Sequence, residues 1–98
     1  MLYKHIETEG IYLVYLKGKL KKDGVWVKCV HYRRLPVLLK PHEDINEIYT
    51  RTQEDFDEKF VEVTYEQLVN MPGVKRKHLN VIDSFRKKEQ FLEWMFKN

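Results

Sequence analysis

The sequence has little of what builds disulfides, flexible linkers or sharp turns. Among its 98 residues are one cysteine, Cys29, with 4 glycines and 3 prolines. A lone cysteine cannot form an internal disulfide, and a thiol within an apolar stretch is typical of an inert buried residue, so we expect no redox chemistry. Repeats, low-complexity tracts and linkers are missing as well, which predicts a single domain over residues 1–98.

Long apolar runs and targeting segments are also missing. The longest apolar runs, such as residues 11–16, are far too short to span a bilayer. The sequence does not open with a basic segment followed by an apolar one, which argues against a signal peptide. With 34% charged residues, we expect a soluble, cytoplasmic protein that does not interact with membranes.

An excess of one charge is missing, because 18 basic residues are nearly balanced by 15 acidic ones and the net charge is only +3. The charges are nevertheless grouped along the sequence. Residues 17–34 are rich in lysine and arginine with Asp23 as the only carboxylate, residues 41–62 are acidic, and residues 75–88 are basic again. One interpretation is that these segments pair with each other or form ordinary solvated surface. The other is a basic face that binds an acidic partner.

Catalytic and metal-binding motifs are missing too. The sequence contains no phosphate-binding loop, no Gly-x-Ser-x-Gly and no cysteine matched with a histidine for catalysis. Cys29 and His31 would share one face of a strand, but a structural zinc needs four ligands and the sequence suggests no further pair. The acidic residues 54–58 lack a calcium-loop pattern and instead favour the start of a short helix. We therefore expect no enzyme, no cofactor and no metal site.

β-branched and aromatic residues predict strands over residues 3–6, 11–16, 25–33, 47–52 and 61–63. Asp23-Gly24 is a strong turn signal, so the second and third strands should form an antiparallel hairpin with a basic loop. Neither face of the third strand is cleanly polar, which places it inside the sheet with Trp26 and Val30 in the core. Replacing Trp26 with alanine would then cost about 3 to 5 kcal/mol.

Capping patterns predict two short helices after the fourth strand. Thr52 can cap a helical turn that presents Phe56 and Phe60 to the core. Thr64, followed three residues later by Gln67, forms a capping-box pattern for a second helix.

The clearest helix is at the C-terminal end. Asn80 can cap it, and an apolar stripe follows at nearly helical spacing, formed by Ile82, Phe85, Leu92 and Met95. Its first half should dock on the sheet and its second half, residues 91–96, should extend beyond it. The predicted fold is α+β: a small, strongly twisted antiparallel sheet or an SH3-like partial barrel over residues 3–63, followed by a helical extension over residues 64–98 with a C-terminal amphipathic helix.

The strand residues also form a recurring pattern: Tyr3-x-His5, Gly10-x-Tyr12-x-Val14, Trp26-Val27, Val30-x-Tyr32-Arg33, Tyr49-x-Arg51 and Phe56-x-x-Lys59-Phe60. This pattern resembles a family of small bacterial and bacteriophage domains of unknown function. The resemblance covers residues 3–63, and it implies a compact β-rich fold without assigning an activity. The chain departs from the family pattern over residues 35–46 and after Thr64, so the resemblance does not interpret the C-terminal helix.

Two basic clusters support a nucleic-acid-binding interpretation. One lies in the predicted hairpin at residues 17–22. The other consists of Lys75, Arg76, Lys77, Arg86, Lys87 and Lys88. Clustered cations release counterions from phosphates, so we expect at most weak, salt-sensitive binding. Five aromatic residues would either stack on bases or pack in the core: Tyr12, Tyr15, Trp26, Tyr32 and Tyr49.

Large apolar residues near the C-terminus support a protein-binding interpretation: Phe91, Trp94, Met95 and Phe96. The apolar arc is too wide for one small sheet, so part of it should stay exposed and bind a protein partner or a second copy of the chain. Because the net charge is modest, we expect a non-catalytic protein-binding module, of the inhibitor or adaptor type that phages encode. The alternative is a small nucleic-acid-binding β-barrel that acts through its basic patches.

Overall fold

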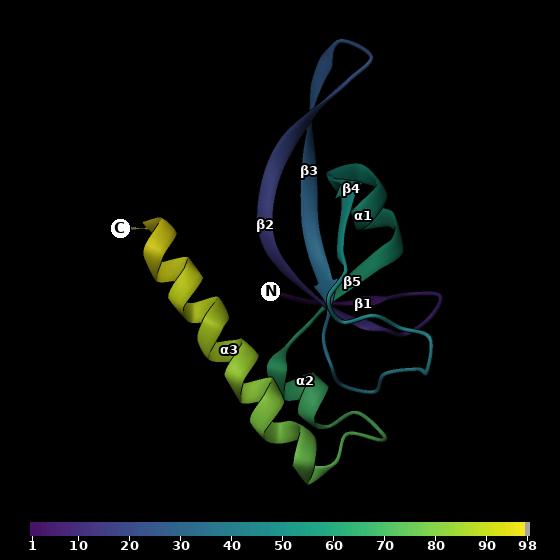
Figure 1. Cartoon of the computed structure of the whole chain (residues 1–98), viewed down its shortest axis with the longest axis vertical. Helices are drawn as coiled ribbons and strands as arrows, with labels where there is room; N and C mark the ends of the chain where they lie inside the picture. The colour runs from purple at the N-terminus through teal and green to yellow at the C-terminus, as the bar shows by residue number, and fades with distance from the viewer. Residues whose placement is uncertain (98) are drawn as a thin grey trace.

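The β-branched and aromatic segments pair into one open antiparallel sheet (Figure 1). The computed structural model describes residues 1–97, apart from the side chains at positions 92, 93, 96 and 97. In this part of the chain the strands are β1 (Leu2–His5), β2 (Ile11–Lys22), β3 (Val25–Arg34), β4 (Ile48–Thr52) and β5 (Phe60–Val63). Their order across the sheet is β4-β3-β2-β1-β5, so β3 is an interior strand as predicted. Of the two predicted forms, the structure has the twisted sheet, since the strands do not close into a barrel.

Helices cover both faces of this sheet. α1 (Gln53–Lys59) lies against one face, and α2 (Tyr65–Val69) and α3 (Arg76–Lys97) lie against the other. The core on the α1 side consists of Val14, Val30, Tyr32, Phe56 and Phe60. The core on the α3 side consists of Leu2, Ile11, Leu13, Leu35, Val37, Val63, Leu68 and Ile82. Alternation along β2 separates the two, because successive side chains of a strand point to opposite faces.

The β2–β3 hairpin is longer than the sequence predicts. Its turn is Asp23-Gly24, and both residues have positive φ angles, 50° and 79°, as a type I′ hairpin turn requires. Residues 17–22 are not the expected basic loop, because they continue β2 and pair with β3 as far as Lys22 and Val25. This pairing satisfies backbone groups that a loop would leave to water. The hairpin consequently projects from one end of the molecule (Figure 1).

Trp26 does not lie in the core, and this prediction was wrong. Its side chain is 65% exposed, whereas Val30 is buried as predicted with 1% exposed. The reason is the reach of the neighbouring strand: β4 pairs with β3 only between Arg33 and Cys29. Beyond Cys29 the described residues provide no third strand, so the expected cost of Trp26→Ala does not apply.

The two predicted helix caps are confirmed, but the start of the last helix is not. The Thr52 hydroxyl accepts a hydrogen bond from the Asp55 amide at 3.2 Å, and Thr64 and Gln67 form both bonds of a capping box. These caps depend only on neighbouring residues, which is why the sequence predicts them.

α3 begins at Arg76 instead of after Asn80. His78 explains the earlier start, because its Nδ1 accepts a hydrogen bond from the Lys75 amide at 2.9 Å. This is the role that Glu or Gln plays in a capping box, three positions into the helix.

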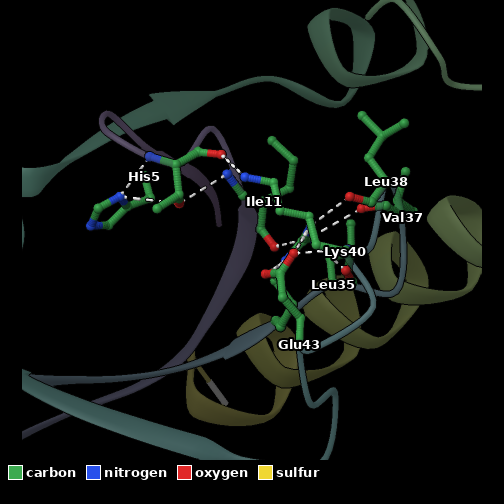
Figure 2. Close-up of polar contacts among 10 residues, drawn as sticks. His5, Ile11, Leu35, Val37, Leu38, Lys40 and Glu43 are labelled. Atoms are coloured by element: carbon green, nitrogen blue, oxygen red, sulfur yellow. Dashed lines mark hydrogen bonds and ion pairs between the residues drawn. The ribbon is translucent and has the colours of Figure 1, made fainter.

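Arg34 ties the connection between β3 and β4 to the sheet. Figure 2 labels five residues that take part in these contacts: Ile11, Leu35, Val37, Leu38 and Glu43. Its side chain is 2% exposed, and its Nε donates to the Glu43 carboxylate at 2.6 Å. The guanidinium also donates to backbone carbonyls at 2.8 to 3.0 Å, those of Ile11, Leu35, Val37 and Leu38. Because these carbonyls come from β2 and from the connection, one buried cation holds the two segments together.

Glu43 should make stability depend on pH. Its hydrogen bond with Arg34 lowers the pKa of this carboxyl below the value of about 4.3 in an unfolded chain. A lowered folded pKa stabilises the fold above the unfolded value, and this contribution is lost as pH falls through the folded value. We therefore expect Glu43→Gln to reduce the free energy of unfolding near neutral pH and to differ less from wild type in acid, as measured by urea denaturation. A difference that stays constant across this range would contradict the assignment.

Candidate functional site

The C-terminal part of α3 leaves the sheet (Figure 1). The first part of the helix docks through Val81, Ile82 and Phe85, which pack against the α3-side core. Further along, the Glu89 carboxylate binds the amino terminus of Met1 and accepts a hydrogen bond from the Tyr65 hydroxyl. Glu89 therefore holds this part of α3 to the body of the protein.

Beyond Glu89 lies an exposed apolar surface, which we call the α3 end. It consists of Phe91, Trp94 and Met95, whose exposed fractions are 58%, 62% and 46%. The rings of Phe91 and Trp94 stack with 6.2 Å between centroids and 29° between planes, as residues three positions apart on a helix can. Phe96, the fourth residue predicted for this surface, has a side chain outside the described residues.

The basic residues of α3 are exposed but partly compensated. They form two groups, Arg76 and Lys77 at the start of the helix, with Lys75 just before it, and residues 86–88. Eleven positions are about three turns, so Arg76 lies on the same side of α3 as Lys87, and Lys77 on the same side as Lys88. Asp83 pairs with Lys87 at 3.1 Å and with Arg86 at 3.6 Å. The Lys88 ammonium lies 5.1 Å from the centroid of the Phe85 ring. The ion pairs with Asp83 lower the positive charge that Arg86 and Lys87 present to an anion.

A second basic surface is the projecting part of the β2–β3 hairpin, residues 16–28, which we call the arm. It carries Lys17, Lys19, Lys21, Lys22 and Lys28. Cross-strand pairing sets Lys19 against Lys28 and Lys21 against Trp26. The first turn of α3 lies at the opposite end of the molecule from the arm (Figure 1), so the basic residues at the start of α3 lie far from the arm lysines.

An irregularity in β2 decides which way the arm lysines point. The pairing with β3 shifts between Val14 and Leu16, which makes Tyr15 the extra residue of a β-bulge. After the bulge, the odd-numbered residues take the face that Val14 occupies before it. One face of the arm therefore carries Lys17, Lys19, Lys21, Trp26 and Lys28, all of them exposed. This grouping was not predicted from the sequence, although the two-residue turn implies the cross-strand partners.

Most of the aromatic residues considered for base stacking pack against one another. Tyr32 is 4% exposed, and its ring contacts Tyr12 edge-on at 5.5 Å and stacks on Tyr49 at 5.6 Å. Behind them lie Phe56 and Phe60, whose rings stack at 4.2 Å. Core packing is therefore the role of Tyr32, Phe56 and Phe60, whereas Tyr49 is 37% exposed at the edge of the cluster. Trp26 is separate from this cluster.

An open hollow of about 480 Å³ lies beside this cluster, lined by Lys22, Tyr32, Tyr49, Thr50, Arg51, Thr52 and Asp55. Its central cation, Arg51, donates to the Tyr32 hydroxyl and to the Asp55 carboxylate, both at 2.6 Å. The ammonium of Lys59 and the guanidinium of Arg51 lower the pKa of Asp55. Arg51, Asp55 and Lys59 thus form ion pairs with one another beside the hollow. We therefore assign these charged groups a structural role.

Cys29 and His31 lie together as their strand spacing predicts, with 3.8 Å between Sγ and Nε2. His31 Nδ1 is 2.8 Å from the Thr50 hydroxyl, and Cys29 is 3% exposed. Within the described residues, no group of three potential metal ligands of the types His, Cys, Asp and Glu comes together.

No helix in the described part of the chain is both long and apolar enough to cross a membrane. Comparison with protein-family models, curated proteins and solved structures finds no match to this chain. The resemblance to small bacterial and bacteriophage domains therefore stays a prediction.

Proposed function

We propose that this protein is a non-catalytic protein-binding module that uses the α3 end as its binding surface. The observation that supports this most is the exposure of Phe91, Trp94 and Met95 on the part of α3 that follows Glu89. Exposed apolar patches on a soluble domain usually mark interaction sites, because they otherwise promote aggregation. Aromatic residues also dominate the binding energy of protein interfaces. A small module of this kind acts as an adaptor or an inhibitor.

The occupant we propose is the α3 end of a second copy. Two antiparallel α3 helices related by a two-fold axis between positions 92 and 93 place Phe91 of each copy against Trp94 of the other. A two-fold contact uses the same patch twice and so needs self-complementary residues. Phe91 and Trp94 meet this need, since their rings already stack within one chain.

We expect the wild-type chain to self-associate and Trp94→Glu to abolish the association, because the substitution places a charge at the centre of the contact. Sedimentation velocity over a range of concentrations measures this as a sedimentation coefficient that rises with concentration for wild type only. Trp26→Glu is the matched control, because the two tryptophans are 65% and 62% exposed and lie on different elements. Wild-type protein that stays monomeric at every concentration would rule out the second copy as occupant. Association that Trp26→Glu abolishes and Trp94→Glu does not would place the contact elsewhere.

A further inference from the structure

We propose that the arm binds single-stranded nucleic acid, with its lysines on the phosphates and Trp26 stacked on a base. This second site is on a different element from the α3 end and does not depend on the function proposed there. Its basis is one exposed face that combines cations and a large aromatic ring: Lys17, Lys19, Lys21, Trp26 and Lys28.

Carboxylates offset the positive charge of the arm only in part. The ion pairs formed by the described residues include none of the five arm lysines, in contrast to Arg86 and Lys87 on α3. The one carboxylate within the arm is Asp23 at its tip. Glu54 of α1 lines a hollow with Lys22 and Lys28, so a carboxylate of the body offsets part of the charge of these two lysines.

The arrangement of the lysines suits a chain of phosphates. Side chains two positions apart on one strand face lie about 6.6 to 6.8 Å apart, so Lys17, Lys19 and Lys21 form a regular row along β2. Lys28 adds a fourth cation from β3, opposite Lys19. A flexible single strand can adjust the spacing of its phosphates to such a row, and every phosphate bound releases counterions.

Trp26 distinguishes a nucleic acid from an acidic protein as the ligand. An acidic peptide would use only the lysines, whereas an unpaired base also offers a π-face for the indole ring. Trp26 is 65% exposed, with the Lys21 ammonium 5.9 Å from its ring centroid. In a duplex the bases are stacked on each other and closed to Trp26, so the exposed ring favours single strands.

Fluorescence anisotropy with a labelled oligothymidylate, and with a duplex of equal length, tests the proposal. We expect single-strand binding whose log–log slope against salt is about −3, the value for roughly four phosphate contacts. The triple variant Lys17→Gln, Lys19→Gln, Lys21→Gln should weaken binding about tenfold or more and bring the slope to about −1. Trp26→Ala should weaken binding about fivefold or more with an unchanged slope, because it removes stacking and leaves the charges.

A matched control removes the same formal charge from α3, through Arg86→Gln, Lys87→Gln and Lys88→Gln, and should bind as wild type does. In a Trp94→Phe chain, where Trp26 is the only tryptophan, oligothymidylate should quench the fluorescence, and this readout needs no change in the arm. Tighter binding to the duplex would overturn the proposal, as would equal affinity for polyglutamate, loss of binding in the α3 control alone, or unquenched Trp26 fluorescence in the presence of excess oligothymidylate.

Discussion

Arg34→Met should lower the free energy of unfolding by about 3 to 5 kcal/mol, the usual cost of removing one partner from a buried ion pair. The substitution keeps much of the side-chain volume, so the loss comes from the groups that remain. Glu43 would keep a carboxylate without its main partner, and carbonyls on β2 and the 35–46 connection would lose their donor. Each buried polar group left unpaired costs about 1 to 3 kcal/mol.

Urea denaturation measures the Arg34 effect, with Arg86→Met as the matched control. Arg86 is 52% exposed in an ion pair of 3.6 Å, so its loss should cost less than about 0.5 kcal/mol. A double-mutant cycle with Glu43→Gln separates the ion pair from the carbonyl contacts, because the latter persist when only Glu43 is changed. A loss below about 1 kcal/mol for Arg34→Met would show that Arg34 does not hold the connection.

Phe56→Ala should also destabilise the fold by about 3 to 5 kcal/mol, as expected for truncating a buried phenylalanine. Phe56 is 1% exposed, stacks on Phe60, and meets the Tyr3 ring edge-on at 4.9 Å. It is the only buried residue of α1, a helix of 7 residues that the structure describes completely. A helix this short is not stable without tertiary packing, so the substitution should release α1 as well as create a cavity.

Phe91→Ala is the matched control for Phe56→Ala, since the same change at a side chain that is 58% exposed should cost less than about 1 kcal/mol. Thermal and urea denaturation of the two variants compare them directly. Equal losses would contradict the assignment of Phe56 to the core and of Phe91 to the surface.

Local signals in the sequence determined the turn and two of the helix starts. Asp23-Gly24, Thr52 and the pair Thr64 and Gln67 act on residues within a few positions, so their effect does not depend on the rest of the fold. The width of the apolar arc likewise predicted that part of the last helix would stay uncovered, and Phe91, Trp94 and Met95 are exposed. The partners across the arm were not predicted, because residues 17–22 were expected to form a loop, although a two-residue turn at Asp23-Gly24 sets the register of both strands.

The tertiary structure decided which residues of each strand and helix are buried. Trp26 and Val30 lie on the same face of the same strand, but one is exposed and the other buried because β4 pairs with β3 only as far as Cys29. In the sequence, Arg34 is one of several cations of a basic segment. In the structure, the 35–46 connection folds over it and supplies Glu43 and backbone carbonyls as its hydrogen-bond acceptors. Periodicity and composition indicate which residues can be buried together. Whether a given residue is buried depends on segments that are distant in the sequence, and no local pattern specifies the length or path of those segments.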